Sequence, residues 1–233
     1  MENYNPVDDK DRKMADLILE NHFLILVLER FGVSFGLQDM TIEEVCDNNN
    51  INISIFFTIV NLHLNLKAPP GLIVNDNDIG TIVKYLERSH QYYSSEVIPH
   101  ISQQIRSLCS TNKDLSFKLI ERFFDEYKDE VSKHLRYEES VVYPYALSLL
   151  EIKNQRQGFA ISDYKNNHED IETKLDDLKN LLIKYLPEKG DQKYRRNLLF
   201  QLFRFEKDLR IHTIIEENIL IPQIEKAESK LMS

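Results

Sequence analysis

A short motif whose residue types can bind metal occurs twice in this chain. The first copy runs from His134 to Pro144 as HLRYEESVVYP, and the second runs from His212 to Pro222 as HTIIEENILIP. In each copy a glutamate follows the histidine by four residues, and an apolar run and a proline come next. Residues four apart lie on one face of a helix, so each copy can direct an imidazole and a carboxylate toward one point.

The two copies belong to a longer internal repeat. They are separated by 78 residues, and the same offset relates His90 to His168. As a result, the spacing of 44 residues from His90 to His134 recurs from His168 to His212. Four histidines and two glutamates therefore form a two-fold repeat.

This set of side chains suits a pair of metal ions. Neutral imidazole and carboxylate fit iron, manganese or zinc, and the sequence leaves the choice among them open. A glutamate can bridge two ions while each ion keeps its own histidines, as in helical bundles whose core holds a di-metal site. A single motif of this kind is usually a surface pair. Here apolar neighbours predict an interior position instead: Val141, Val142, Ile214, Ile215, Ile219 and Leu220.

With these residues the chain resembles the hemerythrin-like HHE cation-binding domain, in particular the di-iron proteins of iron–sulfur cluster repair (RIC, ScdA type). The segment HQYYSSEVIP from His90 is similar to the first-helix histidine segment of that family. The resemblance implies a four-helix bundle with two non-haem irons, bridged by carboxylate and by oxo or hydroxo. It further implies terminal ligands at His90, His134, His168 and His212, and bridging ligands at Glu138 and Glu216. Hemerythrin itself has a further histidine and an aspartate, for which this sequence shows no counterpart.

Glycine is scarce, and no long stretch alternates apolar with polar residues. These features predict that the ligands are held by an all-α fold. The prolines and glycine of residues 67–71 predict a boundary between a small helical module, 1–70, and a bundle, 76–233. We expect helices over residues 13–31, from the capping box at 41–44 onward, and over 54–66, 78–108, 115–150, 162–185 and 193–230.

The N-terminal module resembles the ScdA-N domain that precedes the bundle in the repair proteins. The similar segments are residues 15–18, 29–33 and 41–46. That domain typically has a Cys-Cys-Gly-Gly run where this chain reads Phe35-Gly-Leu-Gln-Asp39. Thiol chemistry is therefore not expected there, and the module is interpreted as a packing or dimerisation element, with a homodimer as one possibility.

Composition narrows the classes of function. The 233 residues carry a net charge of −9 without a basic block, which argues against a nucleic-acid partner. The polar start and the short apolar runs predict no signal peptide and no membrane span, so we expect a cytoplasmic protein. Cys46 and Cys109 are the two cysteines, and without a CxxC motif they are interpreted as ordinary thiols.

Several other residues have a predicted place. His100 should point about 80° away from the ligand face, so it is not expected to bind metal. His22 and His63 are expected at or near the surface of the N-terminal module. Glu130 and Asp208 each precede a ligand histidine by four residues, and they are expected either to form a carboxylate path that brings iron to the site or to be outer-shell or solvated acids. Glu169 and Asp170 are expected to accept the outer ring N–H of His168. The aromatics near the ligands are Tyr92, Tyr93, Tyr137 and Tyr164.

The resemblance implies a stress-response protein that helps to restore iron–sulfur clusters damaged by nitric oxide or peroxide. Its partners would be O2, NO or peroxide and damaged iron–sulfur proteins. A second hypothesis is an O2 or NO sensor or carrier that keeps its iron, which the missing cysteine pair favours. A third is an enzyme that reduces NO or peroxide, and for this no catalytic residue is assigned.

Overall fold

A computed structural model of the chain describes residues 10–65, 78–110, 114–149, 161, 164, 171–186 and 192–231. Within these ranges the fold is all-α, as predicted, and β structure is limited to one isolated bridge between Lys13 and Thr41. The chain forms two compact units. The first comprises Met1–Ser89, Tyr145–Gly158 and Ile211–Ser233, and the second comprises His90–Pro144 and Phe159–Arg210. The predicted division into domains 1–70 and 76–233 follows other borders and stays a prediction.

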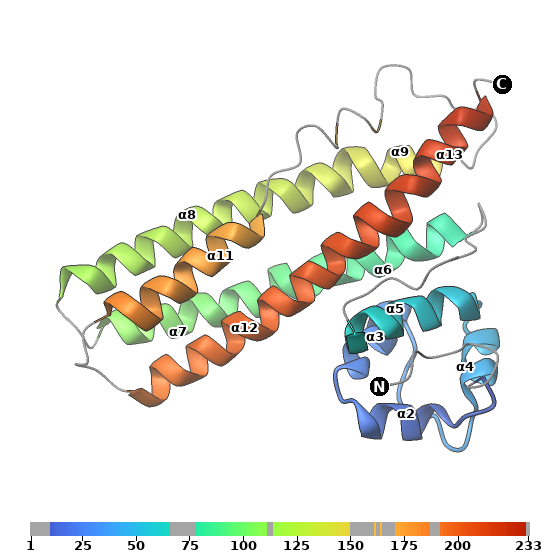
Figure 1. The fold of residues 1–233 in the computed structure, drawn as a ribbon, viewed down its shortest axis with the longest axis horizontal. Coiled ribbons are helices and arrows are strands. Elements are labelled where there is room, and N and C mark those ends of the chain that lie inside the picture. The colour runs from blue at the N-terminus through green and yellow to red at the C-terminus, as the bar shows by residue number, and fades with distance from the viewer. Residues whose placement is uncertain are drawn as a thin grey trace. The chain divides into compact units, whose positions relative to one another are not determined.

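Among the described residues, the N-terminal part of the first unit contains four short helices (Figure 1). They are α2 (Met14–Glu20), α3 (Leu24–Phe31), α4 (Ile42–Asn48) and α5 (Ile53–Asn65). The predicted capping box is confirmed, because Thr41 accepts from the Glu44 N–H while the Glu44 side chain accepts from the Thr41 N–H. Packing of α2 on α3, and of α3 and α4 on α5, buries the apolar faces of these helices.

The prediction of one helix over residues 13–31 is wrong, because the chain breaks between α2 and α3. Asn21 has an extended backbone, with φ −144° and ψ 97°, and its side-chain oxygen accepts a hydrogen bond from the Phe23 N–H at 3.1 Å. A short amide side chain offers the backbone this local alternative to helix. The apolar pattern continues across the break, which is why periodicity alone did not reveal it.

The remaining helices each contain a π-helical turn. They are α6 (Ile79–Tyr92), η2 (Tyr93–Val97) and α7 (Ile98–Ser110); α8 (Leu115–Tyr137), η3 (Glu138–Val142) and α9 (Tyr143–Ser148); α11 (Ile171–Asn180) and η4 (Leu181–Tyr185); and α12 (Gln192–Ile215), η5 (Glu216–Leu220) and α13 (Ile221–Leu231). These bounds agree with the predicted helices where the structure describes them. The start of the helix predicted over residues 162–185 lies outside the described residues.

Prolines explain where three of these π turns lie. Pro99, Pro144 and Pro222 each stand two residues after a π turn, within a helix that continues past them. A proline has no N–H and clashes with the carbonyl four residues earlier. In each case the residue just before the proline donates its N–H to the carbonyl five residues back. The interruption that Pro99 imposes on its helix takes the form of a π turn, a feature often found at functional sites.

The core of the second unit is a stripe of large apolar side chains from α7, α8, α11 and α12, which lie side by side in Figure 1. On α8 the stripe recurs every three or four residues, as one face of an amphipathic helix requires. Its members on α8 are Phe117, Ile120, Phe124, Tyr127, Val131 and Leu135. The next position on the same face is Glu138, so the pattern that builds the core also carries a carboxylate into it.

Within the first unit, Gly32 ends α3 in the left-handed conformation, with φ 81°. A Cβ atom there would lie 2.6 Å from Nη1 of Arg88, which donates a hydrogen bond to the Arg30 carbonyl at 2.8 Å. The absence of a side chain at Gly32 thus lets Arg88 of α6 reach the end of α3.

We predict that Gly32→Ala destabilises the protein by ~2–3 kcal/mol. About 1–2 kcal/mol comes from the left-handed backbone and about 1 kcal/mol from the displaced Arg88 hydrogen bond. The measurement is the free energy of unfolding in urea for the wild type, Gly32→Ala, Arg88→Ala and the double variant. In an Arg88→Ala background the same glycine substitution should cost only the backbone part. Equal costs in the two backgrounds would contradict the contact.

Candidate metal centre

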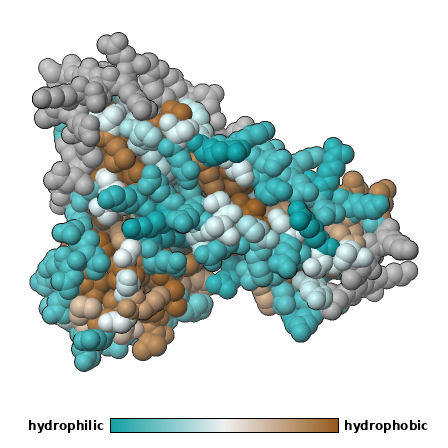
Figure 2. All heavy atoms as spheres, turned by 180° about the vertical axis from the view of Figure 1, so that it is seen from behind, coloured by the Kyte–Doolittle hydropathy of each residue, from teal (hydrophilic) through white to brown (hydrophobic). Residues whose placement is uncertain are grey.

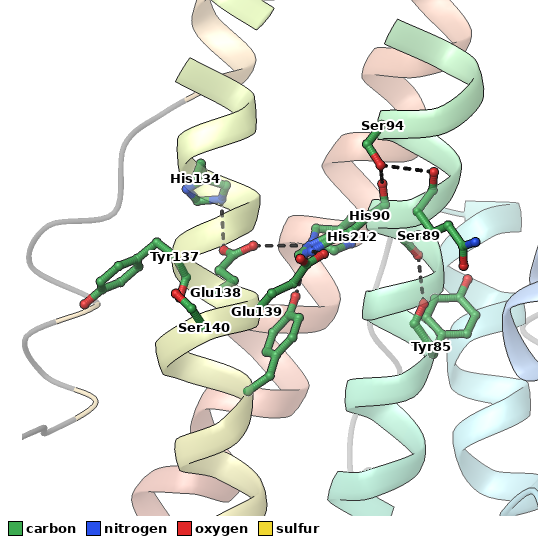
Figure 3. Close-up of polar contacts among 12 residues, drawn as sticks. Tyr85, Ser89, His90, Ser94, His134, Tyr137, Glu138, Glu139, Ser140 and His212 are labelled. Carbon is green, nitrogen blue, oxygen red and sulfur yellow. Dashed lines mark hydrogen bonds and ion pairs between the residues drawn. The ribbon is translucent and has the colours of Figure 1, made fainter. Parts of the chain in front are cut away.

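The candidate site in the second unit is centred on Glu138, which is fully buried at the first position of η3. Its two carboxylate oxygens face two different histidines. Oε1 lies 2.9 Å from Nε2 of His134, one turn earlier, and Oε2 lies 3.2 Å from Nε2 of His90 on α6. Figure 3 shows the carboxylate between the two imidazoles. This is the arrangement that a carboxylate bridge between two ions requires.

The distances between these donor atoms fit ligands of a common ion. A first-row metal binds imidazole nitrogen or carboxylate oxygen at about 2.1 Å, so two donors at right angles lie about 3 Å apart. The pairs of Glu138 with His134 and with His90 both have this spacing. Imidazole and carboxylate also match the ligand preferences of iron. The residues present therefore fit a metal at each oxygen of Glu138.

The outer nitrogen of His90 is held by a second carboxylate. Nδ1 lies 3.0 Å from Oε1 of Glu139, a side chain that is 45% exposed. When Nδ1 carries the proton and donates it to Glu139, Nε2 presents its lone pair to the interior. Such an outer partner fixes the tautomer and the ring orientation of a metal-binding histidine and raises its basicity.

Two buried phenols complete the surroundings of Glu138. The hydroxyl of Tyr143 lies 3.1 Å from Nε2 of His90, and its ring stacks on the imidazole with 5.4 Å between centroids. Tyr164 donates a hydrogen bond to Oε1 of Glu138. Burial alone would raise the pKa of Glu138. However, the hydrogen bonds and charges of His134 and His90 outweigh that effect and hold this pKa far below its ordinary range.

The second copy of the motif forms a similar pair in the first unit. His212 lies in the last turn of α12, and Glu216 begins η5, with 3.5 Å between Nε2 of His212 and Oε2 of Glu216. Both side chains are buried.

Other predicted residues have different outcomes. His168, Glu169 and Asp170 lie outside the described residues. His100 is exposed and bonds to Gln104 at 2.7 Å, which agrees with its predicted direction away from the ligand face. The surface position predicted for His63 is wrong, because its side chain is buried. Its Nε2 lies 3.1 Å from the Tyr85 hydroxyl, so the contact of α5 with α6 encloses it.

The structure also shows the surroundings of Glu130 and of the two cysteines. Glu130 pairs with Lys174 of α11, so its carboxylate is engaged in an interhelical ion pair. Burial raises the pKa of the Cys46 thiol to about 12 and that of Cys109 to about 11. Both cysteines are free thiols and stay protonated near neutral pH, which is consistent with their interpretation as ordinary thiols.

Sequence reasoning missed Glu139 and Tyr143. A signal for Glu139 was available, because Glu217 stands at the repeat-related position next to Glu216. The signal for Tyr143 was hidden by the π turn. In an α-helix, residues five apart point about 140° away from each other. In η3 the Tyr143 N–H bonds to the Glu138 carbonyl, which brings these two residues to one face.

Comparison with known proteins adds one match. Residues 81–224 match the family model described as the hemerythrin HHE cation binding domain, which is well over half of the chain. The matched segment contains all six predicted ligands. No curated protein shows significant similarity to the chain. Among the described residues, no helix combines the length and the apolar character that crossing a membrane needs.

We predict that Glu139→Ala lowers the affinity for metal by about 10–100-fold, because His90 loses the partner that orients its ring. The measurement is competition for Fe(II) between the protein and a chelator of known affinity. Glu96→Ala, which removes an exposed carboxylate from η2, is the matched control and should leave the affinity unchanged. An equal loss in both variants would reduce the effect to net charge and contradict the role of Glu139.

Proposed function

The chain belongs to the hemerythrin family of HHE cation-binding domains, and we propose that it holds two non-haem iron ions. The proposed ligands are His90, His134, His168, His212, Glu138 and Glu216. The observation that carries this proposal is the buried Glu138 carboxylate, which directs one oxygen to each of two histidines. A buried carboxylate without compensating partners is costly, and two bound cations would compensate it fully.

The proposal also divides the histidines between the two ions. His90 and His134 face different oxygens of Glu138, so we assign them to different ions. The 78-residue offset exchanges His90 with His168 and His134 with His212. We propose that His90 and His212 serve one ion and that His134 and His168 serve the other, a division that the repeat leaves unchanged.

The chain's own residues have distinct parts in this function. Bound iron would supply reversible redox change and a coordination position for a small ligand such as O2 or NO. Glu138 would fix the two positions relative to each other, and Glu139 would hold the His90 ring in its binding tautomer. The large apolar side chains of the core exclude water on one side, whereas Glu139 reaches solvent on the other.

As the biological role we propose repair of damaged iron–sulfur clusters under nitrosative or oxidative stress, in the cytoplasm, by release of iron to the damaged protein. The resemblance to the repair-type proteins in both halves of the chain supports this role. The alternative is an O2 or NO sensor or carrier that keeps its iron. It is supported by the absence of the Cys-Cys pair at Phe35–Asp39, since a thiol pair is one means of passing metal onward.

For the N-terminal helices we propose a ScdA-N-like module that serves in association with a second copy. Figure 2 shows hydrophobic surface gathered over these helices. Exposed apolar side chains there include Leu19 at 84% and Phe35 at 62% of their full exposure. Such residues support an interface better than a site of thiol chemistry, because the cysteine pair of the related domain is missing.

The ligand assignment predicts two irons per chain and a graded response to substitution. Glu138→Ala and Glu216→Ala should lose both irons, whereas His90→Ala and His168→Ala should each weaken one position. Glu138→Gln tests the bridge more narrowly, since its amide presents a single good donor oxygen and should leave one of the two irons without its Glu138 ligand. The measurements are iron per chain and the Mössbauer spectrum, with circular dichroism to check folding.

His100→Ala is the control for this series and should retain full iron content. Loss of iron in His100→Ala together with full iron in His168→Ala would contradict both the ligand set and the repeat. A single metal per wild-type chain would contradict the dinuclear site.

Iron transfer separates the two roles. We predict that the reduced, iron-loaded protein gives up iron to a damaged [4Fe–4S] protein and restores its activity. This should be faster than with the same amount of free Fe(II), when both reactions contain the same concentration of a chelator. A protein that keeps its iron under these conditions, yet binds NO, is the sensor or carrier instead.

A further inference from the structure

The buried phenol of Tyr143 lies beside the nitrogen of His90 that faces Glu138. Tyr143 is the first residue of α9, directly after η3, and its side chain has no solvent exposure. Its hydroxyl oxygen lies 3.1 Å from Nε2 of His90, the nitrogen that also lies 3.2 Å from Oε2 of Glu138. Three donor atoms of three side chains thus meet at the inner edge of the His90 imidazole.

The spacing of these atoms suits binding to one ion. Donors at right angles around a first-row metal lie about 3 Å apart, and both distances from Nε2 of His90 have this value. The stacking of the Tyr143 ring on the imidazole, with 29° between their planes, restricts the phenol to this region. A phenol oxygen is a hard donor, and tyrosine is an established protein ligand of ferric iron in other folds.

The internal repeat does not reproduce this phenol. The position related to Tyr143 by the 78-residue offset is Ile221, which is likewise the first residue after a π turn and directly precedes a proline. Ile221 is buried as well, but it offers no donor atom. Tyr143 and Ile221 therefore occupy equivalent backbone positions, but only Tyr143 has a side chain that can bind metal.

We propose that Tyr143 is a protein ligand of the ion bound by His90, in its ferric state, and that it makes the two metal positions chemically different. This inference rests on the proposed di-iron site. When the bond forms, the phenol O–H breaks, the oxygen binds Fe(III), and the proton leaves to solvent without any change in the oxidation state of the iron. An added small anion then binds at the other iron.

Tyr164 provides a matched comparison within the same site. Its hydroxyl is also buried and donates to Oε1 of Glu138, on the side of His134. A phenol that only donates a hydrogen bond to a ligand gives no charge-transfer band, whereas a phenolate bound to ferric iron does. The spectrum therefore separates a ligand from a hydrogen-bond donor, independently of any activity.

The experiment uses the full chain, loaded with iron and oxidised. The wild-type protein should show phenolate-to-iron absorption in the visible range, with phenolate vibrations in the resonance Raman spectrum that shift when ring-deuterated tyrosine is incorporated. Tyr143→Phe should lose this band while it keeps two irons per chain, and Tyr164→Phe should keep it. Azide titration should give one bound azide per chain in the wild type and two in Tyr143→Phe.

Two irons per chain without phenolate vibrations in the wild type would overturn the inference and leave the di-iron proposal intact. A band that persists in Tyr143→Phe and disappears in Tyr164→Phe would do the same and would assign the ligand to Tyr164. A wild-type chain that binds no iron under any loading condition would overturn the di-iron proposal together with this inference. The isotope shift is measured on the wild-type protein, so the test does not depend on the folding of a variant.

Discussion

The structure depends on a carboxylate that is buried in an apolar core. Glu138 continues the stripe of large side chains on α8, so folding removes its charge from water along with the apolar residues beside it. An isolated carboxylate in such a place is unfavourable by several kcal/mol. Imidazoles at both of its oxygens and the phenol of Tyr164 offset this cost within the chain. The same orientation of donors that stabilises the carboxylate also prepares it for two metal ions.

The π turns link this electrostatic constraint to the prolines that follow them. A helix that meets a proline must find another acceptor pattern, and here the residue before each proline bonds five residues back. In η3 that bond joins Tyr143 to the backbone of Glu138, and in η5 it joins Ile221 to that of Glu216. A backbone device repeated in both halves of the chain thus places a side chain beside each glutamate, and the identity of that side chain differs between the halves.

Much of this account could be predicted from the sequence, because it depends on periodicity and on a repeated offset. The all-α fold, the helix bounds and the motif pairs of His134 with Glu138 and of His212 with Glu216 follow from such patterns. The break at Asn21 did not, because a local side-chain hydrogen bond decides it. The burial of His63 depends on a tertiary contact with Tyr85, and the hydrophobic periodicity of a helix does not predict such a contact. Tyr143 escaped prediction because the α-helical period does not hold across a π turn.

The central claim is that the two oxygens of Glu138 bind two different ions. It is tested most directly by anomalous X-ray diffraction at the iron edge from crystals of the iron-loaded protein. We predict two anomalous peaks per chain, one within bonding distance of Oε2 and His90 and the other within bonding distance of Oε1 and His134. A single peak, or two peaks of which neither contacts Glu138, would contradict the account.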